Sequence, residues 1–266
     1  MDQFKSYLII MAPLLAGIAV AQTLERFGPW KKEPNADALK WLQAALLYLT
    51  GILLAHGVLP ISQTAASLWA RDGGFGVLNQ FDTPLWAGVL IALVAGDLWD
   101  YARHRALHRW SALWRIHRLH HSPTHIDVSA AFRFHPIEAL ITAFGHLAVA
   151  VALGAPPEAF VIRIVISVVV NFWGHANVRW PNGLQRRLSA VIITPNLHRL
   201  HHGAQAGQMG SNFGFILSVW DRAFGTLSTP SKDCREFHDL EFGLGDASRL
   251  SFDATTELFI DPLRRD

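Results

Sequence analysis

The chain has 266 residues, of which 51% are hydrophobic and 17% charged, whereas an ordinary soluble domain carries roughly 25% charged residues. A formal net charge of +2 and a mean hydropathy of +0.22 exclude a disordered chain, a basic protein that coats nucleic acid, and a coiled coil. The single cysteine, Cys234, excludes an intramolecular disulfide and a metal site with several thiolates. What remains is a membrane protein, or an unusually apolar globular one, with 14 histidines.

Five apolar segments approach the roughly 20 residues that a membrane-spanning helix needs. In chain order they are Tyr7–Leu24, Ala38–Ile61, Pro84–Trp99 with its continuation to Tyr101, Ala139–Ala155 and Ala159–Trp173. The last two are short and are separated by two prolines, which indicates a tilted or shallow hairpin. One such run can be a buried core helix, but five in a chain of this length favour a membrane protein. Residues 1–24 could instead be a cleaved signal peptide, although their start is only weakly basic.

Basic residues alternate between the connections that join these segments. Three follow the first segment, six arginines lie between the third segment and the fourth, and Arg179, Arg186 and Arg187 come soon after the fifth. By contrast, Arg71 is the only basic residue after the second segment, and the turn at residues 154–158 has none. The positive-inside rule therefore predicts an N-terminus outside the cell and a cytoplasmic location for the residues after the third and fifth segments.

Twelve of the 14 histidines lie between His104 and His202, and eight of these fall into three clusters. The clusters are His104 with His108; His117, His120 and His121; and His198, His201 and His202. Helical positions three and four apart share a face, so each cluster can direct two or three imidazoles at one point. Imidazole suits iron, zinc, copper and nickel, and eight imidazoles are too many for one ion, so the pattern predicts two metal ions. For the isolated His56, His146 and His238 we expect ordinary core or surface roles.

Acidic residues are scarce near the clusters. No Glu-x-x-His and no His-Glu-x-x-His string occurs in the chain, which excludes a ferritin-like carboxylate site and the common zinc-protease site. Asp97 and Asp100 precede His104 by seven and four residues. We expect one of these carboxylates to accept the second ring N–H of a ligating histidine; the alternative is a pair of helix-end charges at the membrane boundary.

Longer motifs surround the histidine clusters. They are Asp97-Leu-Trp-Asp-Tyr101-Ala-Arg-His104-Arg-Ala-Leu-His108, Arg133-Phe-His135-Pro136-Ile-Glu138, Asn171-Phe-Trp-Gly-His175-Ala-Asn177, Asn212-Phe-Gly214 and Trp220-Asp221-Arg-Ala-Phe224-Gly225-Thr226. Over residues 84–230 the chain resembles the fatty acid hydroxylase superfamily, also called the sterol desaturase family, of integral-membrane di-iron oxygenases.

The resemblance implies an all-α fold, in which a bundle of about 4–5 membrane helices carries a cytoplasmic helical cap that holds a di-metal site. It implies N-terminal membrane helices in residues 1–83, a catalytic domain in 84–230 and a C-terminal tail in 231–266. It adds His175 as a ninth metal ligand, and His125, His135 and Asn171 as ligands or neighbours of ligands. The metal implied is a pair of iron ions, for which zinc can substitute in the isolated protein.

The function that the resemblance implies is O₂-dependent hydroxylation or desaturation of a lipid. Electrons would come from a separate reductase, ferredoxin or cytochrome, and no nucleic acid would be involved. Two alternatives stay open, namely a metal-dependent hydrolase or lyase that acts on a lipid headgroup, and a metal transporter. Hydrolysis is disfavoured because the clusters contain no general-base glutamate. Transport is disfavoured because the histidines lie at the ends of the apolar segments, not at their centres.

Overall fold

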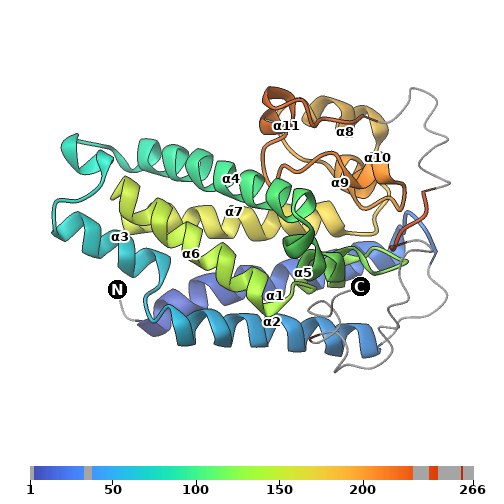
Figure 1. Cartoon of the computed structure of the whole chain (residues 1–266), viewed down its shortest axis with the longest axis horizontal. Helices are drawn as coiled ribbons and strands as arrows, with labels where there is room; N and C mark the ends of the chain where they lie inside the picture. Colours follow the sequence, from blue (N-terminus) through green and yellow to red (C-terminus); the bar gives the residue numbers. More distant parts are fainter. Residues whose placement is uncertain (1–2, 33–37, 230–239, 245–258, 260–266) are drawn as a thin grey trace.

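The computed structural model describes residues 3–32, 38–229, 240–244 and 259, without the side chains of residues 3–11, 13 and 206. Five long helices lie side by side (Figure 1): α1 (Gln3–Phe27), α2 (Ala38–Val58), α4 (Leu85–Arg109), α6 (Pro136–Leu153) and α7 (Pro157–His175). Helix α3 (Gln63–Asp72) and the 3₁₀ helix η1 (Val77–Gln80) lie at one end of this bundle. Short helices gather at the opposite end as a cap: α5 (Ser111–His121), η2 (Val128–Phe132), α8 (Asn182–Leu188), α9 (Pro195–His201), α10 (Ala206–Met209) and α11 (Val219–Ala223).

The fold is helical, as the sequence predicts. Within the described ranges there is no β-strand, only three isolated bridges. Four segments are long and apolar enough to cross a membrane: Ala38–Gln80, which contains α2, and the helices α4, α6 and α7. These four correspond to the second, third, fourth and fifth predicted segments. The first predicted segment is helical as α1, but many of its side chains lie outside the description, so its membrane crossing stays a prediction.

Large apolar side chains cover the outside of the bundle. Leu53 is 71% exposed, Trp86 71% and Phe144 64%. Such a surface is unfavourable in water but matches the hydrocarbon of a bilayer. The burial pattern therefore agrees with the hydropathy of the sequence in placing the bundle within a membrane.

The ends of the helices follow from local chemistry. Helix α6 begins at Pro136, whose missing N–H costs nothing in the first turn, and the Nδ1 atom of His135 caps it by accepting the N–H of Ile137 at 3.2 Å. It ends at Gly154, which adopts the left-handed φ of 58° that glycine tolerates. Helix α4 continues to Arg109, beyond the predicted apolar segment, because no glycine or proline interrupts residues 97–109.

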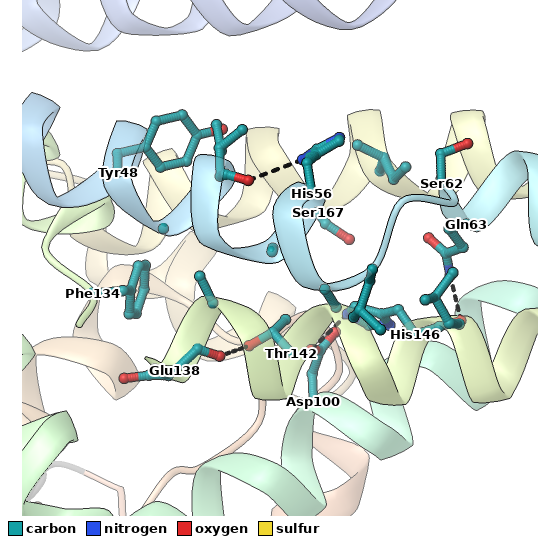
Figure 2. Close-up of a pocket in the computed structure, with 18 of the residues that line it drawn as sticks. Tyr48, His56, Ser62, Gln63, Asp100, Phe134, Glu138, Thr142, His146 and Ser167 are labelled. Carbon is teal, nitrogen blue, oxygen red and sulfur yellow. Dashed lines mark hydrogen bonds and ion pairs between the residues drawn. The ribbon is translucent and has the colours of Figure 1, made fainter. Parts of the chain in front are cut away.

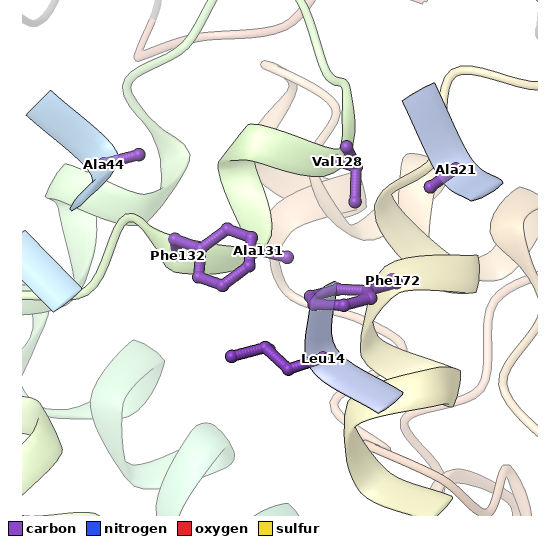
Figure 3. Close-up of a cluster of buried hydrophobic side chains, with 7 residues drawn as sticks. All are labelled: Leu14, Ala21, Ala44, Val128, Ala131, Phe132 and Phe172. Carbon is purple, nitrogen blue, oxygen red and sulfur yellow. The ribbon is translucent and has the colours of Figure 1, made fainter. Parts of the chain in front are cut away.

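One hydrophobic cluster attaches the cap to the bundle (Figure 3). It joins Leu14 of α1 and Ala44 of α2 to Val128 and Phe132 of η2 and to Phe172 of α7. The rings of Phe132 and Phe172 are 5.2 Å apart. Because Phe172 lies three residues before His175, this packing fixes the end of α7 that points into the cap.

Candidate metal centre

The histidine clusters lie at the C-terminal ends of helices. Helices α4, α5, α7 and α9 carry histidines in or just beyond their last turns. The C-terminal end of a helix bears a partial negative charge, which favours a nearby cation. The dipoles of these helices therefore favour a bound cation at the point where their C-terminal ends meet.

Nine histidines converge there in two groups. In each group, one side-chain nitrogen from every member lies within 4.8 Å of those of the others. The five-histidine group contains His104, His108, His117, His121 and His201. The four-histidine group contains His120, His175, His198 and His202.

Each His-x-x-His-His string divides its members between the two groups. His117 and His121 belong to the five-histidine group, whereas His120 belongs to the other. Successive helical residues are rotated by about 100°, so positions i and i+4 differ by about 40° while i+3 and i+4 differ by about 100°. We expected each string to direct three imidazoles at one point. Instead, each string contributes histidines to both groups.

Hydrogen bonds to Nδ1 fix the tautomers of four rings. Nδ1 of His104 lies 2.9 Å from the carbonyl oxygen of Phe213, and Nδ1 of His201 lies 2.7 Å from that of Ser211. Nδ1 of His175 lies 2.8 Å from the carbonyl oxygen of Asn171. Nδ1 of His117 lies 3.0 Å from Oε2 of Glu138. Since carbonyl and carboxylate oxygens accept hydrogen bonds, each Nδ1 is the donor and each Nε2 keeps its lone pair.

These lone pairs have no partner in the five-histidine group. The Nε2 atoms of His104, His108, His117, His121 and His201 are buried and make no hydrogen bond. Polar atoms left in that state are unfavourable by roughly 1–3 kcal/mol each. A cation among them would satisfy all five, so this donor set fits a metal ion.

The four-histidine group is tighter. The Nε2 atom of His198 lies 2.9 Å from that of His175 and 3.1 Å from that of His202, and the Nε2 atoms of His175 and His120 are 3.3 Å apart. His175 presents a lone pair from Nε2 because its hydrogen is on Nδ1. Four ring nitrogens directed at one small volume are the arrangement expected around a bound cation.

Burial keeps the cap imidazoles neutral, which is the form that binds metals. Removal from water lowers the pKa of His201 to about 3. It also holds the pKa values of His120, His121, His198 and His202 well below the usual value. At neutral pH these five rings need not lose a proton before they bind a metal ion.

Glu138 has a role that the sequence analysis does not assign. It is buried, it accepts a hydrogen bond from His117, and its Oε1 atom accepts one from Nη1 of Arg103 at 2.8 Å. The sequence contained a signal, because Glu138 closes the motif that begins at Arg133 and is a rare acid within the histidine-rich region.

The expectation for Asp97 and Asp100 is wrong. Asp97 accepts hydrogen bonds from the backbone N–H groups of Ile216 and Leu217 at 2.7 and 2.9 Å, and from the ring of Trp220 at 3.0 Å. Asp100 pairs with Arg163 of α7 and His146 of α6. It shares a helical face with His104 but lies one turn deeper in the bundle, where these groups surround it. Acceptors elsewhere, such as Glu138, orient the clustered rings.

Three further candidates lie outside both groups. His125 is exposed and contacts the Thr124 hydroxyl at 3.2 Å. His135 caps α6. Asn171 supports His175 through its backbone carbonyl, while its side-chain amide donates to Ala131 at 3.2 Å. His238 lies outside the described residues.

A comparison with protein families identifies the family of this chain. The model for fatty acid hydroxylases matches residues 89–226, more than half of the chain and all nine grouped histidines. The chain belongs to the fatty acid hydroxylase family. Together with the two histidine groups, membership makes the centre a metal-binding site in an integral membrane protein.

Several curated proteins are similar to this member of the fatty acid hydroxylase family. Ornithine lipid hydroxylase OlsE of Rhizobium tropici is 28% identical over 82% of this chain and 66% of its own length. Alkylglycerol monooxygenase of Xenopus tropicalis is 31% identical over 77% of this chain and 44% of its own. Very-long-chain aldehyde decarbonylase GL1-1 of Oryza sativa subsp. japonica is 28% identical over 65% of this chain and 29% of its own length. The match thus spans less than two thirds of each relative. No solved structure matches the chain.

Proposed function

We propose that the protein is a membrane-bound di-iron oxygenase that hydroxylates or desaturates an unactivated C–H bond of a lipid. The observation that carries the proposal is the pair of buried histidine groups with their unpartnered Nε2 atoms. The relatives named hydroxylase and monooxygenase support the same reaction class.

The proposed ligands are the nine grouped histidines, five for one iron and four for the other. Iron, when bound, would activate O₂ for oxidation of the lipid. An all-imidazole donor set suits iron and also zinc, and of these two only iron supplies redox chemistry. Glu138 and the backbone carbonyls on Nδ1 hold the rings in place.

An apolar cavity of about 430 Å³ lies next to the centre, between α2, α6 and α7 (Figure 2). Its wall includes three residues that contact grouped histidines: Phe134 stacks on His120 at 4.6 Å, Glu138 bonds His117, and Asn171 bonds His175. The cavity is therefore one layer of side chains from both groups. We propose that it holds the apolar part of the lipid and keeps water away from the reacting carbon.

The distribution of basic residues supports a cytoplasmic location for the cap. There the centre would receive electrons from a separate reductase, ferredoxin or cytochrome.

The test of the reaction class is its dependence on oxygen. Lipids from cells with and without the protein are compared by mass spectrometry under air and under argon. We expect a product with one added oxygen, or with two hydrogens fewer, that forms only under air. Equal product formation under argon would overturn the oxygenase and favour the hydrolase or lyase.

The test of the ligand set is the metal content of two histidine variants. His120→Ala removes a member of the four-histidine group, so we expect it to lose activity and about half of the bound metal. His125→Ala, an exposed histidine outside both groups, should keep both. If His120→Ala retains the wild-type metal content, the ligand assignment is wrong.

A further inference from the structure

Arg199 is a buried cation in the third histidine cluster, where it directly follows His198. It is only 1% exposed, and a charged side chain is unfavourable in that state unless its donors are bonded. Helix α9, which carries it, packs against the end of α7 that enters the cap (Figure 1). The partners of Arg199 therefore lie between these two helices.

The guanidinium bonds the chain just beyond α7. Its Nη2 atom donates to the carbonyl oxygen of Ala176 at 2.8 Å and to that of Val178 at 2.7 Å. Ala176 directly follows His175, the last residue of α7. One side chain thus links the neighbour of His198 to the neighbour of His175, and the Nε2 atoms of these two histidines lie 2.9 Å apart.

The end of α1 supports the same link. The ring of Trp30 lies 4.6 Å from Cζ of Arg199, and such a contact is favourable for a guanidinium withdrawn from water. The backbone N–H of Trp30 donates to the carbonyl of Asn177 at 3.0 Å. Oε1 of Glu25 accepts the N–H of Asn177 at 2.8 Å. Residues after α1 therefore hold both the guanidinium and the segment that it bonds.

The five-histidine group is held by other contacts. His201 follows Arg199 by two residues on α9, but its Nδ1 atom donates to the carbonyl of Ser211 at 2.7 Å. His117 is oriented by Glu138. Arg199 takes part in neither of these bonds. The two groups are thus supported by different parts of the cap.

We propose that Arg199 is a positioning residue for the four-histidine group, which it holds in place independently of the five-histidine group. Without its two bonds, α9 and the end of α7 are less firmly joined, so His198 and His175 no longer converge as closely. Lysine cannot replace Arg199, because it keeps the charge but lacks the planar, weakly hydrated guanidinium that lies on a ring. This inference rests on the proposed ligand set of the metal centre.

The test is the release of zinc from protein loaded with Zn²⁺ in detergent, measured against increasing concentrations of a chelator. The wild type should hold two ions. In Arg199→Lys we expect one ion to leave at a chelator concentration about 10–100-fold lower, the usual effect of losing a group that orients a ligand. The other ion should stay as in the wild type. Wild-type retention of both ions, or equal loss of both, would overturn the proposal.

The matched control is Arg222→Lys. Arg222 also donates to a backbone carbonyl of the cap, that of Ser189 at 2.9 Å, but it is exposed and belongs to α11. Its replacement removes the same kind of bond away from both histidine groups. We expect it to retain both ions, and selective release of one ion from this variant would contradict a specific role of Arg199.

Double variants identify the ion that Arg199 holds. At the chelator concentration that frees one ion from Arg199→Lys, the addition of His120→Ala should release no more metal, because both changes affect the same group. The addition of His104→Ala should release the second ion. The opposite pattern would overturn the assignment.

A second variant covers the case in which Arg199→Lys does not fold. Trp30→Leu keeps both bonds of Arg199 to the carbonyls and removes only the ring beside the guanidinium. We expect one ion to leave it at about fivefold less chelator than the wild type requires. Unchanged release, or equal loss of both ions, would overturn the proposal.

Zinc release needs no turnover, so the two proposals can fail separately. Selective release from Arg199→Lys, in a protein without O₂-dependent oxidation, would overturn the oxygenase alone. Equal release of both ions, in a protein whose wild type oxidises lipid with O₂, would overturn the role of Arg199 alone. A wild type that holds fewer than two zinc ions would overturn the ligand set and, with it, this role of Arg199.

Discussion

At the scale of residues, Glu138 joins the metal centre to the membrane bundle. Its two carboxylate oxygens bond His117 of the cap and Arg103 of α4, and both partners are buried. One negative charge therefore orients a proposed ligand and also compensates a buried cation. A buried cation left without its partner is strongly unfavourable.

Replacement of Glu138 should therefore weaken metal binding. In Glu138→Gln we expect the metal affinity to fall by about 10–100-fold, the usual effect of removing a group that orients a ligand. The measurement is the metal retained against increasing concentrations of a chelator. Glu158→Gln, an exposed acid at the far end of the bundle, serves as the control and should match the wild type. Equal retention in both variants would contradict this role of Glu138.

At the scale of elements, two glycines let the α3–η1 connection dock on the α6–α7 turn. Gly76 has a φ of 93°, and a Cβ atom there would lie 2.4 Å from the backbone nitrogen of Gly154. The Ser67 hydroxyl donates to the carbonyl of Ala155 beside it. Because backbone meets backbone, neither side can move to make room for a side chain.

Alanine substitutions separate crowding from backbone strain. Gly74 also has a positive φ, 72°, but nothing lies within 4 Å of its Cβ position. We expect Gly74→Ala to reduce the free energy of unfolding by about 1 kcal/mol, and Gly76→Ala to reduce it by more than about 3 kcal/mol. Thermal unfolding of the purified proteins in detergent measures the difference. Similar losses in the two variants would show that the close approach to Gly154 does not matter.

At the scale of the whole molecule, the bundle has two different ends. The cap and all nine grouped histidines lie at one, and the α3–η1 connection and the α6–α7 turn lie at the other (Figure 1). The metal centre consequently lies toward one side of the membrane, which the positive-inside rule predicts to be the cytoplasm.

Cysteine labelling tests this orientation. In a Cys234→Ser background, Asp72→Cys places a thiol at the α3 end and Arg187→Cys places one on the cap, both at exposed positions. We expect a membrane-impermeant maleimide to label Asp72→Cys in intact cells, and Arg187→Cys only after permeabilisation. The reverse pattern would place the centre outside the cell.

The sequence by itself determined the features that depend on spacing along the chain. Hydropathy located the spans that correspond to α2, α4, α6 and α7. Repeated histidines at helical intervals identified eight of the nine histidines that converge, and the family resemblance supplied His175. Pro136 after His135 anticipated the start of α6.

Only the tertiary structure decided which of these residues meet. The spacing of each His-x-x-His-His string separates its i+3 histidine from the other two, but which members of the two strings share a group depends on how α5 and α9 are placed in the cap. Asp100 lies on the expected face of α4, yet Arg163, 63 residues away, and His146 of α6 engage it. Spacing specifies which side chains share a face of one helix, whereas contacts between helices depend on packing across the whole bundle. For that reason the residues of the site were predictable, and the partners of Glu138, Asp97 and His146 were not.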